Sequence, residues 1–166
     1  MNDIRLEPLE KKDEDWVRVF MVEHWGSEEM VIRGEVVQMV GLPGFAALRD
    51  GKRVGLVTYQ VSGEECEITS LDSLEEKQGI GTRLIAAVNR AARELNCKRL
   101  ILVTTNDNLK ALRFYQKRGF RLRMIWPGAV DLGRQIKPHI PLIGENGIPI
   151  HDELELERDV IELDAT

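Results

Sequence analysis

The alternation of apolar and polar positions predicts how the chain begins. Residues 4–7 alternate apolar with polar side chains, as in a half-buried strand. Apolar side chains then crowd one side of residues 13–24, which is typical of an amphipathic helix. Ser27 is a good capping residue, so we expect a second helix that begins there and runs through Met30.

The next part of the chain predicts an antiparallel meander. Residues 45–49 and 53–61 are strand-like and flank the turn sequence Asp50-Gly51-Lys52, which is a strong hairpin signal. A second turn at residues 62–64 leads into a third strand over residues 66–74. These strands should pair with one another in chain order.

A strand, a helix and another strand follow one another in the middle of the chain. Residues 83–95 have a clear helical period, and the apolar stripe consists of Ile80, Leu84, Val88, Ala91 and Leu95. Residues 99–105 contain an unbroken apolar run, as in a central strand that is buried on both faces. This order predicts a right-handed crossover between parallel strands.

The last third of the chain predicts one more helix and two more strands. The helix begins after Asn106-Asp107-Asn108 and ends at Gly119-Phe120, and strands follow at residues 121–126 and 153–158. Residues 127–150 hold four of the six prolines and four of the fourteen glycines and have no clean period. We expect an ordered irregular loop there, because the chain returns to a strand, and a loop of this length in a compact domain is usually functional. It could form a lid over an acceptor substrate.

Composition limits the class of protein. The chain of 166 residues is 43% apolar and 31% charged, which predicts a single globular domain over residues 1–166, and the predicted strands and helices make its class α/β. The net charge of −5 argues against nucleic acid or an anionic membrane as a partner. We expect a cytoplasmic protein, since the N-terminus is unlike a signal peptide and Cys66 and Cys97 have the character of buried, reduced thiols. The three histidines are too dispersed to predict a metal site.

The stretch from Leu71 to Leu84 carries the most informative local chemistry. Gly79 and Gly81 lie between a predicted strand and a predicted helix, and apolar Ile80 separates them. Glycine allows a ligand to approach the main chain, and the first amides of a helix attract an anion. The stretch therefore predicts a cradle for phosphate or pyrophosphate, although an ordinary tight turn can have the same pattern.

Two blocks of sequence together resemble the GNAT superfamily of acyl-CoA-dependent N-acyltransferases. The first block is Gly79-Ile80-Gly81-Thr82, and the second, Asn108 to Phe120, is similar to the family pattern Asn-x-x-Ala-x-x-x-Tyr-x-x-x-Gly-Phe. The predicted order of strands and helices agrees with the family over residues 4–126. The resemblance implies a central, mostly antiparallel twisted sheet with a parallel crossover, helices on both faces, and acetyl-CoA as co-substrate without a metal.

The resemblance also implies which residues bind the acyl-CoA. They are Leu71, Ser73, Lys77, Gln78, Gly79, Ile80, Gly81, Thr82, Asn106, Asn108, Ala111 and Tyr115. One position departs from the family pattern, because Glu76 lies where Arg or Gln is usual. A carboxylate there repels a pyrophosphate unless it points away or pairs with Lys77 or Arg83, whereas backbone amides can still bind the phosphates.

Direct attack of an amine on a thioester requires a polarised carbonyl, a base and an acid. By motif spacing, the N–H of Leu71 is the expected oxyanion donor. Tyr115 is the expected acid for the leaving thiolate, and the alternative is a tyrosine that only packs beside Phe114. Glu67, acting directly or through a water molecule, is the favoured base, and the alternatives are Asp72 and Asp107.

Strand alternation separates the first two base candidates. Glu67 and Asp72 are five positions apart in the predicted strand, so alternation sends them to opposite faces and only one of them can face the reaction. Each carboxylate could also be an ordinary surface group, and Asp107 could be a helix N-terminal charge.

The favoured function is an N-acetyltransferase that moves the acetyl group of acetyl-CoA to the primary amine of a small molecule. The alternatives are transfer to a protein N-terminus or lysine, and a non-catalytic module that binds or senses acyl-CoA. The basic group of Arg134, Lys137 and His139 could face an anionic acceptor or only solvent. A homodimer is compatible with the sequence.

Overall fold

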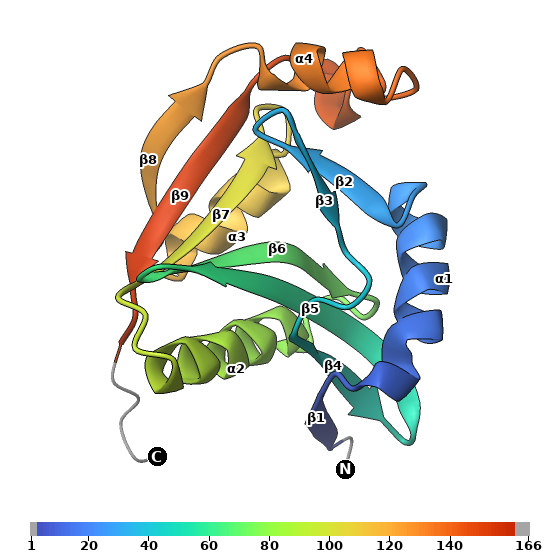
Figure 1. Cartoon of the computed structure of the whole chain (residues 1–166), viewed down its shortest axis with the longest axis vertical. Helices are drawn as coiled ribbons and strands as arrows, with labels where there is room; N and C mark the ends of the chain where they lie inside the picture. The colour runs from blue at the N-terminus through green and yellow to red at the C-terminus, as the bar shows by residue number, and fades with distance from the viewer. Residues whose placement is uncertain (1–2, 162–166) are drawn as a thin grey trace. The chain divides into compact units, whose positions relative to one another are not determined.

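The computed structural model describes residues 3–161, which form two compact units (Figure 1). The first unit contains the described residues within 1–28, 39–100 and 159–166. The second unit contains residues 29–38 and 101–158. No helix within residues 3–161 is long and apolar enough to cross a membrane.

The first unit is built on an antiparallel meander. Its strands are ordered β1 (Ile4–Pro8), β4 (Gly44–Arg49), β5 (Lys52–Ser62) and β6 (Glu65–Ser73). The predicted hairpin between β4 and β5 is confirmed, because Asp50 and Gly51 both have left-handed backbone angles, with φ of 51° and 76°. Left-handed angles at both central residues match the twist of the flanking strands.

Two helices lie on opposite faces of this meander. Helix α1 (Glu14–Trp25) follows the short 3₁₀ helix η1 (Lys11–Asp13), and helix α2 (Ile80–Glu94) follows β6. A Cβ on Gly55 would lie 2.7 Å from Ile80 Cγ2, so Gly55 faces α2. The neighbouring Leu56 is paired with Asp72, which is hydrogen-bonded to Trp25 at the end of α1. Successive residues of a strand point to opposite faces, so the two helices cover different faces, as expected.

The two cysteines are both in the first unit, and both are buried free thiols, as the sequence predicts. Burial raises the pKa of Cys66 to about 12. This thiol is therefore protonated and inert at neutral pH.

The second unit contains two α-helices, a separate two-stranded hairpin and most of three further strands. These three strands are ordered β7 (Arg99–Thr105), β9 (Glu153–Asp159) and β8 (Arg121–Trp126), and β8 and β9 are antiparallel. Its helices are α3 (Leu109–Lys117) and α4 (Ala129–Ile136), and a short 3₁₀ helix, η2 (Glu145–Gly147), precedes β9. Helices and strands occur in both units, which confirms the predicted α/β class. Most strand pairs are antiparallel, as predicted.

The helix predicted from Ser27 is wrong. The chain instead forms a hairpin of β2 (Glu29–Ile32) and β3 (Glu35–Gln38). Arg33 and Gly34 form its two-residue turn, and both have left-handed φ, 52° and 77°. Ser27 resembles a helix N-cap, which led to the prediction of a helix. The hairpin is rich in β-branched side chains, however, and their preference for strands prevailed.

The irregular loop predicted over residues 127–150 contains helix α4, which the sequence analysis missed. The helix has only eight residues and begins after Gly128, a left-handed N-cap with no capping side chain. Gly133 interrupts its pattern, and this glycine is buried with Val31 and Ile140 packed next to it. A helix this short shows too few turns for periodicity to be detected.

Candidate active site

Tyr115 is held rigidly in helix α3 of the second unit. Its side chain is 8% exposed and packs edge-on against Phe114 and Phe120, with ring centroids 5.2 and 5.4 Å away. These edge-to-face contacts fix the orientation of the phenol ring. The helix therefore presents Tyr115 in one defined direction.

The end of α3 is formed as the sequence predicts. Gly119 has a left-handed φ of 89°, and the N–H of Phe120 donates to the carbonyl of Tyr115 over 3.1 Å. This is the hydrogen-bond pattern of a helix closed by a glycine and an apolar residue. Local sequence thus determines both the position of Tyr115 and the packing of Phe120 beside it.

The two asparagines before α3 have different contacts. Asn108 caps the helix, since its Oδ1 accepts from the N–H of Ala111 over 3.1 Å. Asn106 connects the end of β7 to the end of the 127–150 segment. Its Oδ1 accepts from the N–H groups of His151 and Asp152, and its Nδ2 donates to the carbonyl of Pro149. Both polar atoms of the Asn106 side chain thus form hydrogen bonds within the protein, which gives this residue a structural role.

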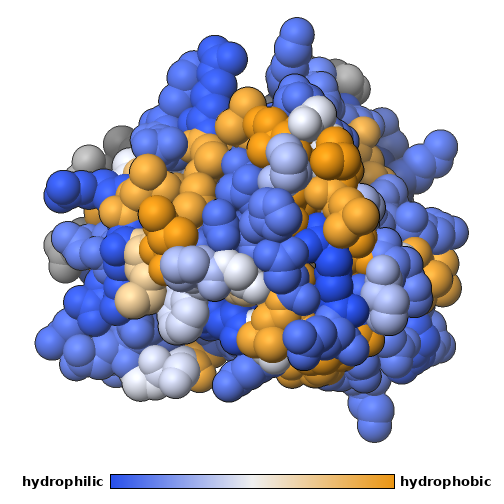
Figure 2. All heavy atoms as spheres, turned by 90° about the horizontal axis from the view of Figure 1, so that it is seen from above, coloured by the Kyte–Doolittle hydropathy of each residue, from blue (hydrophilic) through white to orange (hydrophobic). Residues whose placement is uncertain are grey.

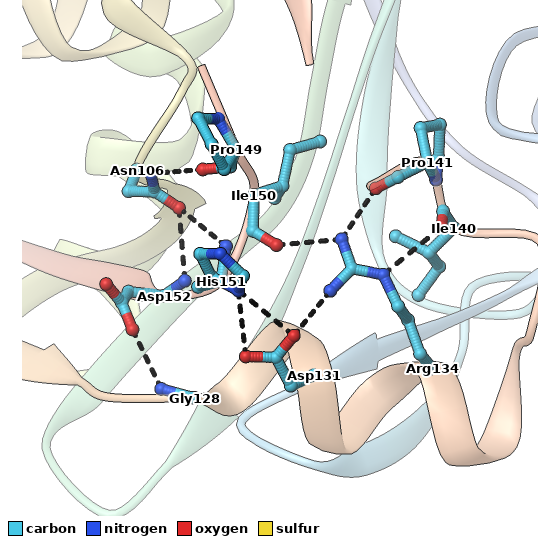
Figure 3. Close-up of polar contacts among 10 residues, drawn as sticks. All are labelled: Asn106, Gly128, Asp131, Arg134, Ile140, Pro141, Pro149, Ile150, His151 and Asp152. Carbon is cyan, nitrogen blue, oxygen red and sulfur yellow. Dashed lines mark hydrogen bonds and ion pairs between the residues drawn. The ribbon is translucent and has the colours of Figure 1, made fainter. Parts of the chain in front are cut away.

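Arg134 on α4 holds the 127–150 segment in place (Figure 3). Its guanidinium donates to the carbonyls of Ile140, Pro141 and Ile150 at 3.2, 2.6 and 2.7 Å, and it pairs with Asp131 at 2.7 Å. Asp131 in turn contacts Nδ1 of His151 at 3.0 Å. The Arg134 side chain is only 12% exposed, so it serves the internal structure of this segment rather than an anionic acceptor.

Removing this guanidinium should loosen the segment. We expect Arg134→Ala to lower the free energy of unfolding by about 1–3 kcal/mol, because it removes a charged donor from three carbonyls. Hydrogen exchange should accelerate at the N–H of Ile150, which bonds to Leu142. Arg134→Lys should not restore protection, since an ammonium lacks the planar fork. Arg113→Ala, at an exposed position of α3, is the control, and equal effects of the two alanine variants would contradict this role.

In the first unit, the N-terminus of α2 has the features of an anion cradle. Gly79 is its N-cap, with a left-handed φ of 72° and no capping side chain. A Cβ on Gly79 would meet nothing within 4 Å, so the main chain is approachable here. The first amides of a helix have no acceptor within the helix, and this applies to Ile80 and Gly81. An anion can therefore bind without displacing a side-chain cap.

Contacts in the first unit fix the position of this helix end. Ile80 is 1% exposed and packs against β5 at Gly55, where any side chain would collide with it. In the preceding turn, Oγ of Ser73 donates to the carbonyl of Glu75 over 2.8 Å, and the carboxylate of Glu75 pairs with Arg49. The turn is thus tied to β6 on one side and to β4 on the other. Glu76 is exposed, so its carboxylate is not buried against these amides.

Glu67 and Asp72 lie on the same face of the sheet, so the prediction of opposite faces is wrong. On β5, Leu56 and Gln60 share a face because the strand alternates regularly, and they pair with Asp72 and Glu67. The register shifts between Thr58 and Tyr59, which leaves Thr69 as an extra residue in β6. One extra residue reverses the alternation beyond it. Both carboxylates can therefore serve one site.

Hydroxyl groups occupy the face between these carboxylates. Oγ1 of Thr58 lies 2.8 Å from Oγ1 of Thr69 and 2.6 Å from Oγ of Ser70. Glu67, 5% exposed, accepts from Nε2 of Gln60 over 3.1 Å. Buried polar side chains therefore form a row on this face of the sheet.

Asp72 contacts the end of helix α1. Trp25 Nε1 donates to its Oδ2 over 3.0 Å. Burial raises the pKa of Asp72 above its usual value, and the hydrogen bond from Trp25 and the charge of His24 offset this only in part. A carboxylate with a raised pKa is a stronger base than an exposed one.

The sequence analysis did not identify Trp25 or Gly55, and it considered Arg134 only as a group that faces an anionic acceptor or solvent. The contact between Trp25 and Asp72 joins positions 47 apart and has no local signal. Gly55 was detectable, because a lone glycine inside a strand often marks a close approach of another element.

Comparison with known proteins identifies the family of this chain. The acetyltransferase (GNAT) family matches residues 10–120. The uncharacterized protein YxbD from Bacillus subtilis is 47% identical over 147 residues, which cover 88% of this chain and 92% of that protein.

Solved structures have the same fold. An acetyltransferase from Bacillus subtilis in complex with CoA has a TM-score of 0.68 at 19% identity, covering 96% of this chain and 100% of that one. A GNAT family acetyltransferase from Elizabethkingia anophelis with acetyl-CoA bound has a TM-score of 0.68 at 20% identity, covering 96% and 99%. The chain belongs to the GNAT family of acetyltransferases and is an acyltransferase, which confirms the resemblance inferred from its two motifs.

Proposed function

We propose that this acyltransferase transfers the acetyl group of acetyl-CoA to a primary amine of a small molecule, by direct attack in a ternary complex. The N-terminus of α2 carries the proposal. It combines an uncapped left-handed Gly79, approachable amides and a helix of 15 residues, and these features fit a diphosphate. Lys77, Gln78, Gly79, Ile80, Gly81 and Thr82 would hold the diphosphate, and Leu71, Ser73, Asn108 and Ala111 would contact the rest of the coenzyme.

The chain supplies the remaining groups that the reaction requires. The amide of Leu71 would polarise the thioester carbonyl. Tyr115 would donate its phenolic proton to the departing thiolate, and the fixed ring supports this role. Asp72 would accept a proton from the ammonium of the acceptor and so free the amine for attack, because burial raises the pKa of Asp72. Glu67 shares its face and would add negative charge that attracts the ammonium.

We propose the 127–150 segment as a wall of the acceptor site. The Arg134 contacts support a fixed wall rather than an open groove, which favours a small molecule. Large apolar side chains of this segment are exposed, namely Leu132, Ile136, Leu142 and Ile143. Figure 2 shows that apolar patches lie between polar side chains on one face of the molecule.

Two measurements on the intact protein test the function. Calorimetry should detect acetyl-CoA binding, and Gly79→Asp should weaken it at least tenfold, because a carboxylate at a helix N-terminus competes with the diphosphate. Release of free CoA across a panel of amines and peptides should identify a small primary amine as acceptor. Binding without turnover of any acceptor would favour the non-catalytic module, and turnover of peptides alone would overturn the small-molecule acceptor.

A further inference from the structure

Strand β8 is the terminal strand in the order β7-β9-β8, and its side chains are unusually exposed. Leu122, Met124 and Ile125 are 57%, 47% and 62% exposed. Among residues 3–161 no other strand pairs with its outer edge. An exposed apolar edge strand offers main-chain donors and acceptors to another strand, which proteins usually avoid unless the edge is used.

A bulge determines which side chains of β8 share a face. Leu122 pairs with Leu156 and Ile125 with Leu154, and these two β9 leucines lie on one face because β9 alternates. The register shifts between Leu122 and Met124, so Arg123 is the extra residue. Without it, Leu122 and Ile125, three positions apart, would point to opposite faces.

Arg123 lies on the opposite face from this leucine pair. It contacts Glu155 at 3.5 Å and Glu157 at 3.4 Å, and these acids alternate with the leucines of β9. Met124 pairs with Glu155 and so belongs to the acidic face. The leucine face of β8 is therefore apolar, and its arginines lie on the other face.

We propose that β8 pairs antiparallel with β8 of a second copy of the chain, with Leu122 of each copy opposite Ile125 of the other. Opposite residues of an antiparallel pair share a face. In this register Arg121 meets Trp126 and Arg123 meets Met124, and each of these pairs also shares a face. A shift by one position would place Leu122 opposite Met124 or Trp126, which lie on the other face. The bulge thus makes the strand complementary to itself in this register.

The side chains on both faces suit a second copy. On the leucine face, Leu122 and Ile125 of both copies would form one apolar cluster, which removes their exposed surface from water. On the acidic face, Arg121 would lie against the indole of Trp126 of the other copy, a favourable cation–π arrangement. Arg123 contacts Glu155 and Glu157, and Glu155 is shared with Arg33, so acidic side chains of the same chain lie beside the charge that Arg123 brings to this face.

Cysteine cross-linking tests the register. Leu122→Cys mixed with Ile125→Cys should give a disulfide-linked heterodimer after mild oxidation. Each variant alone should remain unlinked, because positions three apart along paired strands are about 10 Å from each other, beyond the reach of a disulfide. The native Cys66 and Cys97 are buried, and the parent protein is the control for their contribution.

Sedimentation tests the interface independently of the cysteines. The parent should dimerise as its concentration rises, and Ile125→Lys should weaken the dimer at least tenfold. Leu142→Lys, at a site 67% exposed in the 127–150 segment, should leave it unchanged. A parent that stays monomeric, an Ile125→Lys variant that dimerises as the parent does, or cross-linking by Leu122→Cys alone would overturn the proposal.

Discussion

Replacement of Tyr115 by phenylalanine is expected to lower kcat about 100-fold, the range of general acid catalysis. Phenylalanine has no hydroxyl group, so it cannot donate a proton to the leaving thiolate. The affinity for acetyl-CoA should change less than twofold, because a phenylalanine ring fills the same space between Phe114 and Phe120. Single-turnover kinetics with the acceptor found in the panel, together with calorimetry, separate these two effects.

The chain provides a matched control for this experiment. Its only other tyrosine, Tyr59, is also 8% exposed but lies in the meander of the first unit. Tyr59→Phe should keep kcat near that of the parent. If Tyr115→Phe kept full turnover at every pH, Tyr115 would not be the acid. If acetyl-CoA binding and turnover fell together, its role would be structural.

Replacement of Asp72 by asparagine is expected to lower kcat/KM for the amine about 100-fold at neutral pH. Asparagine cannot accept the proton, although its amide oxygen can still accept the hydrogen bond from Trp25. The loss should shrink at alkaline pH, where the amine is already deprotonated in solution. A pH profile of kcat/KM for the two proteins measures this difference.

The same change should make the protein more stable at neutral pH. The pKa of Asp72 is raised in the folded state, so folding favours the neutral carboxyl. Its contribution to stability is therefore fully present below the unfolded pKa of about 3.9 and is lost as pH rises through the folded value. Asparagine never becomes charged, so Asp72→Asn should gain stability over the parent at pH 7 and lose this advantage below pH about 4. Urea unfolding at both pH values measures the sign.

Two further variants provide a control and a test of the other carboxylate. Asp15→Asn removes an acid whose side chain is 97% exposed, and it should change neither activity nor stability. Glu67→Gln tests the other carboxylate on the same face. A loss of turnover in Glu67→Gln with none in Asp72→Asn would transfer the role of base to Glu67. Lower stability of Asp72→Asn at pH 7 would contradict the burial argument.

The sequence by itself determined the features that depend on neighbouring residues. Gly79 supplies the left-handed N-cap, Asn108 caps α3 and Gly119 closes it, and each was predictable because its hydrogen bonds span only a few positions. The turn at Asp50-Gly51 and the buried strand β7 follow from the same kind of local pattern. These features were sufficient to indicate the GNAT family.

Tertiary structure determined the features for which the local sequence gave no clear preference. The hairpin at Arg33-Gly34 replaced a plausible helix, because its β-branched residues favour a sheet in this setting. One extra residue, Thr69, brought Glu67 and Asp72 to one face, and bulges carry no reliable sequence signal. The contact of Trp25 with Asp72 joins positions 47 apart, and Arg134 donates to the carbonyl of Ile150, 16 positions away. Both contacts depend on tertiary packing, because local sequence does not determine which distant backbone or side chain a residue meets.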